Sequence, residues 1–184
     1  YQDIKKELEI VMKNKEEIPK YDDLMLEPAK SGGIWKTYFL YVNGIKIEKN
    51  CNKCPKTTEL INKIPCMKTA FFSIFEKGVH LVEHRGPYKG VLRYHLGLII
   101  PKRKELCKIR VKNQIRYWEE GKSLIFDDSH LHEAWNNSEE DRVVLFVNFV
   151  RPLRFPLSII NKLAINLAIY SIETKNIMKK LKEV

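Results

Sequence analysis

The chain has 184 residues, of which 44% are hydrophobic and 10% aromatic, and 33 Lys and Arg against 23 Asp and Glu give it a net charge of +10. This apolar content is sufficient for one folded domain and excludes wholesale disorder. The eight Gly and eight Pro follow no repeat, which excludes a collagen-like chain, and no apolar run reaches the roughly 18 residues that a membrane-spanning helix needs. The positive charge leaves nucleic acid, an anionic membrane surface or a small acidic ligand as partners.

The cysteines bear on the cellular compartment. Cys51 and Cys54 form one C-x-x-C pair, but a tetrahedral zinc site would need a second close pair, and Cys66 and Cys107 stand apart. We therefore interpret all four as reduced thiols of a cytoplasmic protein, with association at a membrane surface as the alternative. The first residue is Tyr1 rather than Met, so an upstream anchor or domain stays open, as does the oligomeric state.

The hydrophobic spacing predicts helices at both ends and strands between them. Residues 2–16 have the spacing of a surface helix, Trp35–Val42 is typical of a strand, and Lys56–Lys63 is predicted to be a short helix. The predicted strands that follow are Thr69–Phe75, His80–His84, Val91–Ile100, Cys107–Val111, Gln114–Trp118, Ser123–Phe126 and Arg142–Val150. Short strands with turns at such intervals favour an antiparallel sandwich or jelly roll.

A helical pattern returns after Pro156. Its predicted apolar face consists of Leu157, Ile160, Leu163, Ala164, Leu167 and Ala168, opposite Asn161, Lys162 and Asn166. Residues 151–184 carry seven Lys and Arg against two Glu, which is half of the net positive charge. The common arrangement is a helix that packs its apolar face on the sandwich. The alternative is a helix that lies on an anionic membrane, with the lysines of 175–182 supplying the positive charge.

One predicted strand has a polar face. Alternation over residues 92–98 places Arg93, His95 and Gly97 on one side, and Leu92, Tyr94, Leu96 and Leu98 on the other. A buried Arg and His without an acid in the same strand indicate an anionic ligand such as a carboxylate, because an unpaired buried cation is costly.

Two further histidines, His84 and His132, stand at predicted strand ends 48 positions apart. Non-haem Fe(II) oxygenases use such a pair, normally completed by a carboxylate. Here the third position is Gly86. Taken alone, the pair favours structural histidines.

Longer motifs change this interpretation. R-Y-H-L-G-L-I-I-P, C-K-I-R-V, W-E-E-G-K-S-L-I-F-D-D-S, H-E-A-W-N and R-V-V-L-F follow one another between Ser73 and Phe146. This run resembles the aspartyl/asparaginyl β-hydroxylase family, a branch of the Fe(II)/2-oxoglutarate oxygenases. The flanking W-K-T-Y-F-L, C-P-K-T-T-E-L-I-N-K-I-P and R-P-L-R-F resemble the bacterial branch that includes lipid A acyl-chain 2-hydroxylases.

The resemblance implies a mainly β fold with a double-stranded β-helix core, also called a jelly roll or cupin-like barrel, and flanking N- and C-terminal helices. We expect one oxygenase domain over residues 1–184. It would consist of an N-terminal segment of helix and strand (1–66), the jelly-roll core (67–152) and an amphipathic helical tail (153–184).

The resemblance also implies a site. His84 and His132 would bind Fe(II), and Arg142 would pair with the distal carboxylate of 2-oxoglutarate; these three are the expected catalytic residues. The implied contacts of the co-substrate are Ser73 and Arg142 at the distal end and Arg93 and His95 at the metal-binding end. O₂ would be the second co-substrate, and succinate and CO₂ the co-products.

Gly86 bears on the mechanism that the resemblance implies. Lipid A hydroxylases typically have Asp at this position, whereas eukaryotic aspartyl hydroxylases have Gly and work with two histidines and a water. Chloride fills the same position in related halogenases. Another alternative is that Asp127, Asp128 or Glu133 reaches the metal, although acids that flank a metal-binding histidine more often orient its ring.

We therefore expect hydroxylation of an unactivated C–H bond, first of all at the β-carbon of a peptidyl Asp or Asn. The alternative substrate is a lipid A acyl chain at a membrane surface, which the C-terminal basic helix would contact. An alternative of another class is a non-catalytic basic binding module with structural histidines. The sequence has no RNP or helix-turn-helix pattern, so nucleic acid is not an expected partner.

Overall fold

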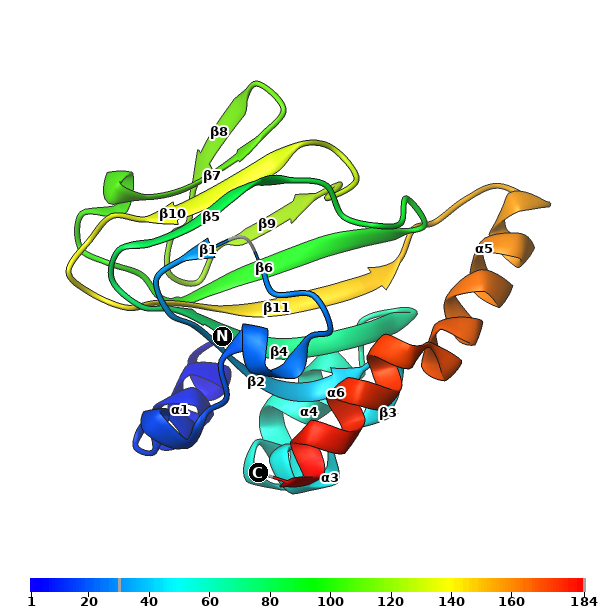
Figure 1. Ribbon diagram of the computed structural model, residues 1–184, viewed down its shortest axis with the longest axis horizontal. Coiled ribbons are helices and arrows are strands. Elements are labelled where there is room, and N and C mark those ends of the chain that lie inside the picture. Colours follow the sequence, from blue (N-terminus) through cyan, green and yellow to red (C-terminus); the bar gives the residue numbers. More distant parts are fainter. Residues whose placement is uncertain (30, 184) are drawn as a thin grey trace.

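The computed structural model describes residues 1–29 and 31–183; residues 30 and 184, which fall in the predicted segments 1–66 and 153–184, lie outside it. Two antiparallel sheets face each other, with helices at the periphery (Figure 1). The five-stranded sheet has the order β1 (Ser31–Gly32), β5 (Val79–His84), β10 (His132–Asn136), β7 (Cys107–Val111) and β8 (Gln114–Tyr117). The six-stranded sheet has the order β3 (Ile45–Lys46), β2 (Trp35–Val42), β4 (Met67–Phe75), β11 (Arg142–Val150), β6 (Val91–Ile99) and β9 (Ser123–Phe126). The predicted mainly β jelly roll with flanking helices is confirmed.

The helices lie before, between and after these strands. They are α1 (Gln2–Met12), α2 (Tyr21–Leu24), α3 (Glu48–Lys53), α4 (Pro55–Ile61), α5 (Leu157–Leu167) and α6 (Ile172–Glu183), with 3₁₀ turns at Lys15–Glu17, Lys104–Leu106 and Ala168–Tyr170. The predicted first helix ends early, at Met12. Strand β10 is absent from the predicted strands; it begins at His132, and His132, Ala134 and Asn136 point inward. Its inward positions are partly polar, so the sequence lacked the usual strand pattern.

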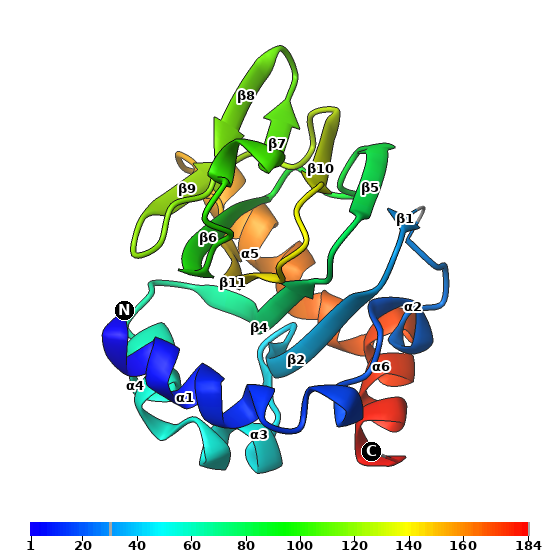
Figure 2. The ribbon, with the colours of Figure 1, turned by 90° about the vertical axis from the view of Figure 1, so that its left-hand side faces the viewer.

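The outer face of the six-stranded sheet is covered by the N-terminal helices, as Figure 2 shows. Leu8 of α1 is fully buried and belongs to one apolar cluster with Leu96 and Leu98 of β6. Arg93 and His95 of the same strand therefore face the other way, toward the second sheet. The predicted alternation along this strand is confirmed, and it leaves a polar inner face.

Two apolar clusters include residues of the inner face of the six-stranded sheet. Phe75, Trp118 and Val144 belong to one cluster, while Phe39, Phe71 and Phe146 belong to another that also contains Ile177 of α6. The polar residues of this sheet described below lie in the same cross-strand rows and in the rows next to them.

The two C-terminal helices differ in how they pack. Ile177 of α6 is buried beside β2, whereas α5 stands away from the sheets (Figure 1). Leu157, Ile160, Leu163 and Leu167 of α5 are each more than half exposed. The expectation that this apolar face packs on the sandwich is therefore wrong. Within residues 1–29 and 31–183, no helix has the length and apolar character needed to cross a membrane.

Candidate active site

The site is built on aligned positions of neighbouring strands. In the six-stranded sheet, inward residues on neighbouring strands are register partners and form rows across the sheet. One row consists of Phe39, Phe71, Phe146 and His95. The next row consists of Thr69, Asn148 and Arg93, and another contains Ser73 and Val144. In the opposite sheet, His132 of β10 is the register partner of His84 of β5. Register fixes both sets, because a shift by one residue would turn every side chain to the other face.

The two strand-end histidines form a matched pair. Their ring centroids are 4.1 Å apart. His84 Nδ1 donates to the carbonyl oxygen of Val82 at 2.8 Å, and His132 Nδ1 donates to that of His130 at 2.9 Å. Each backbone carbonyl thereby selects the tautomer with an unprotonated Nε2. Nε2 of His132 is buried and has no hydrogen-bond partner within the described chain.

Burial keeps both rings neutral. It lowers the pKa of His84, and it lowers the pKa of His132 to about 4, with the neighbouring His84 and Arg93 acting in the same direction. A neutral imidazole with a free Nε2 is the form that binds a transition metal. The pair therefore fits two ligands of an Fe(II) ion. Over the described residues, no group of three His, Cys, Asp or Glu is close enough to hold a metal.

The carboxylate of Asp128 fills the space that a side chain on residue 86 would need. A Cβ atom on Gly86 would lie 2.2 Å from Asp128 Oδ2. The Asp128 carboxylate is 2% exposed and pairs with Arg93 at 2.6 Å, while its Oδ1 has no partner among the described atoms. A buried carboxylate thus occupies the space next to residue 86, although residue 86 does not carry it.

Arg93 is held by more than this ion pair. Its Nε donates to Asn148 Oδ1 at 3.4 Å, and its guanidinium lies 4.4 Å from the ring centroid of Phe146. The acid that we did not find in its own strand is Asp128, which follows β9.

Arg142 is a buried cation without an acidic partner in the described residues. It is 1% exposed, and its guanidinium lies over the rings of Phe75 and Trp118, with 3.7 Å to the centroid of Phe75. Arg142 Nη1 is 3.5 Å from Ser73 Oγ, and Nε has no partner. Burial lowers the pKa of Arg142 to about 10. Such a cation fits an anionic ligand, because a carboxylate would pair with it in bidentate geometry.

His95 lies between these groups. Trp118 Nε1 donates to His95 Nδ1 at 3.3 Å, so the ring proton is on Nε2, a buried donor without a described partner. Burial holds the pKa of His95 well below its usual value, with the charges of Arg142 and Arg93 and the nearby His132 acting in the same direction. His95 therefore presents a neutral N–H donor to the interior.

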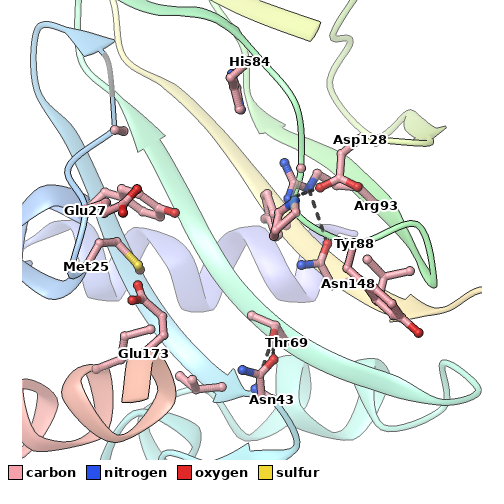
Figure 3. A pocket seen from close by; sticks show the side chains of 18 of the residues that line it. Met25, Glu27, Asn43, Thr69, His84, Tyr88, Arg93, Asp128, Asn148 and Glu173 are labelled. Carbon is pink, nitrogen blue, oxygen red and sulfur yellow. Dashed lines mark hydrogen bonds and ion pairs between the residues drawn. The ribbon is translucent and has the colours of Figure 1, made fainter. Parts of the chain in front are cut away.

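A cavity of about 980 Å³ reaches part of this site. His84, Arg93 and Asp128 lie toward one end of it, and Asn43 and Glu173 lie toward the other (Figure 3). Ile165 of α5 and Ile177 of α6 also line it. Between them, Phe39, Phe71 and Phe146 form a floor that we call the aromatic row, with ring centroids 4.6 and 4.1 Å apart. Ser73, His95, His132 and Arg142 are not in its lining and are nearly fully buried.

The structure thus brings all six predicted site residues into one interior region, and their roles stay predictions. All three acids considered as metal ligands are ion-paired: Asp127 with Arg151, Glu133 with Arg110 and Asp128 with Arg93. In the described part of the chain, none of them forms a metal-binding group with the histidines. The sequence reasoning missed Trp118, Asn148 and the aromatic row. Strand alternation could have found Asn148 and Phe146, since both share a face with Arg142.

The family model described as aspartyl/asparaginyl beta-hydroxylase matches residues 1–152. An ornithine lipid ester-linked acyl 2-hydroxylase of Rhizobium tropici is 49% identical over 173 residues, which are 93% of this chain and 62% of that protein. A human aspartyl/asparaginyl beta-hydroxylase is 40% identical over 131 residues, 68% of this chain and 17% of that protein. The chain therefore spans less than two thirds of either relative.

Among solved structures, a predicted oxalate decarboxylase of Thermotoga maritima aligns with a TM-score of 0.48 at 11% identity, over 74% of this chain and 96% of that one. A Cupin 2 conserved barrel domain protein of Salinispora arenicola aligns with a TM-score of 0.45 at 8% identity, over 82% of this chain and 92% of that one. With the family model matched over residues 1–152 and a relative 49% identical, the chain belongs to the aspartyl/asparaginyl β-hydroxylase family.

Proposed function

We propose that the chain is an Fe(II)- and 2-oxoglutarate-dependent hydroxylase that acts on an acyl chain of a lipid. The observation that carries the reaction class is the neutral His84–His132 pair, with Nδ1 of each ring held by a backbone carbonyl. Fe(II) bound there would activate O₂, so that one oxygen atom enters an unactivated C–H bond while 2-oxoglutarate loses CO₂ and becomes succinate.

The chain's own residues would bind and orient the co-substrate. Arg142 supplies a fixed cation for the distal carboxylate, and Ser73 Oγ lies beside it. His95 supplies a neutral N–H donor whose orientation is set by Trp118. Arg93 and Asp128 neutralise each other at the histidine end, so a ligand there meets an arranged ion pair rather than water.

The cavity supports an acyl chain as the substrate. Its floor is the aromatic row, whose last member, Phe146, lies against both His95 and Arg93. The floor belongs to one apolar cluster with Ile177 of α6, and Phe146 contacts His95, so it offers apolar contact between that helix and His95. The lipid-modifying relative also matches beyond the family model, over 93% of the chain.

A peptidyl Asp or Asn side chain is the second candidate. It is supported by Gly86, which follows the pattern of the eukaryotic aspartyl hydroxylases, and by the human relative at 40% identity. A non-catalytic binding module is the third, and it would show no turnover.

One experiment separates the three. The protein is supplied with Fe(II), 2-oxoglutarate and O₂, together with either detergent micelles of an ester-linked acyl lipid or a peptide that contains Asp and Asn. We expect iron-dependent succinate release and a lipid that gains one oxygen atom by mass spectrometry. If only the peptide is oxidised, the substrate is a peptidyl side chain, which is the second candidate. If neither the lipid nor the peptide gives iron-dependent succinate release, hydroxylation is refuted.

A further inference from the structure

The apolar side of α5 faces outward. Leu157, Ile159, Ile160, Leu163 and Leu167, which we call the α5 apolar face, are between 51% and 65% exposed. Exposed apolar residues also precede and follow the helix in the chain: Phe155 is 80% exposed and Ile172 is 75% exposed. An apolar patch of this size is rare on a protein that has no partner for it.

The opposite side of α5 is anchored by polar contacts. Asn161 is 3% exposed; its Oδ1 accepts from Tyr88 Oη at 2.7 Å, and its Nδ2 donates to the carbonyl of Gly90 at 2.9 Å. A rotation of α5 that buried its apolar face would break both bonds and expose Ile165. The outward orientation is therefore set by the contacts of the helix with the barrel.

The charge around this face is positive. Residues 151–172 contain no Asp or Glu; they contain Arg154 and Lys162 as well as Arg151, which is ion-paired with Asp127. Lys68 adds a cation beside the helix, because its Nζ donates to Asn166 Oδ1 at 2.8 Å. Exposed apolar side chains flanked by cations are the combination that binds an anionic lipid surface.

The helix also forms a wall of the cavity. Ala164, Ile165 and Ala168 line the cavity, whereas the exposed residues of the α5 apolar face are not part of its lining. We propose that α5 lies in the plane of an anionic membrane with its apolar face among the acyl chains, so that a substrate chain enters the cavity beside α5. The entry route rests on the proposed function, whereas the membrane contact does not.

The test is binding to vesicles, and it needs neither iron nor turnover. The full chain is sedimented with vesicles of phosphatidylglycerol and phosphatidylcholine in equal parts and with vesicles of phosphatidylcholine alone. We expect binding to the anionic vesicles, and we expect Ile160→Glu to lower the partition coefficient by at least about tenfold. The matched control is Ile10→Glu, since Ile10 is 59% exposed on α1 and Ile160 is 60% exposed on α5; it should bind as the wild type does.

Three results would overturn the proposal. The first is wild-type protein that stays in the supernatant with anionic vesicles, and the second is Ile160→Glu that sediments as the wild type does. The third is a dimer by light scattering that Ile160→Glu dissociates while vesicle binding is absent, which would show that a second copy covers this face. Succinate release with micellar lipid reports on the proposed function separately, so a failure there leaves the vesicle result to stand by itself.

Discussion

Gly86 and Asp128 share one space beside the histidine pair, because a Cβ atom on residue 86 would lie 2.2 Å from Asp128 Oδ2. The Gly86 N–H donates to the backbone oxygen of Asp128 at 2.7 Å, and the Asp128 carboxylate is fixed by Arg93. Two side chains cannot occupy this space together. The glycine is therefore a packing requirement of Asp128 and not simply a missing ligand.

The substitution Gly86→Ala should destabilise the protein by about 1–3 kcal/mol, because the added methyl group must displace a buried, ion-paired carboxylate. The loss should shrink in an Asp128→Ser background, where the space is free. A double-mutant cycle of urea unfolding measures this coupling. Gly32→Ala is the control, since a Cβ there meets nothing within 4 Å. Additive effects of the two substitutions at 86 and 128 would contradict the packing requirement.

Replacing either member of the histidine pair by Ala should abolish iron-dependent succinate release and weaken Fe(II) binding measured by calorimetry, while the fold is kept. The reason is that each ring supplies one of two ligands. His80→Ala is the matched control, because the side chain of His80 is 41% exposed and stacks on Trp135. Near wild-type turnover in His84→Ala or His132→Ala would show that the ligand assignment is wrong.

Arg142→Met should separate ligand binding from stability. The guanidinium is buried without an acidic partner in the described chain, so a methionine of similar length should keep or raise the melting temperature of the ligand-free protein. The same variant should lose the rise in melting temperature that 2-oxoglutarate gives the wild type, and its apparent 2-oxoglutarate requirement should increase about tenfold or more. An unchanged 2-oxoglutarate requirement would show that Arg142 does not bind 2-oxoglutarate. Arg116→Met, on the exposed strand β8, serves as the control.

The four thiols should differ in reactivity. Burial raises the pKa of Cys54 to about 12 and that of Cys107 to about 11, and it also raises the pKa of Cys51, whereas Cys66 is exposed. The thiolate is the reactive form, so alkylation of the native protein at pH 8 should modify Cys66 and leave the other three intact. Peptide mass spectrometry before and after denaturation measures this difference. Modification of Cys51 and Cys54 in the native protein would contradict their burial.

The raised pKa of Cys54 also makes the free energy of unfolding depend on pH. The unfolded thiol ionises near pH 8.5, the folded one near pH 12, so the folded state holds more protons between these values. The free energy of unfolding should therefore fall as the pH rises through this window. In urea unfolding measured over this pH range, the free energy of unfolding should decline less steeply for Cys54→Ser than for the wild type. An equal decline in both proteins would contradict the raised pKa of Cys54.

Local spacing was sufficient for several features of this protein. The alternation of β6 placed Arg93 and His95 on one face and Leu96 and Leu98 on the other, because a period of two is a property of the strand itself. Helical spacing likewise predicted that α5 is a helix. The sequence motifs also indicated the family and all six candidate site residues.

Contacts between distant residues decided the rest. His84 and His132 became neighbours through the register of β5 and β10, and Asp128 reached Arg93 because the segment after β9 returns beside β6. The helical pattern of α5 could not tell which face is buried; Asn161 decides this through Tyr88 and Gly90, which are 73 and 71 positions away. Periodicity is a property of one element, whereas the side an element buries depends on the polar partners that the whole fold brings to it.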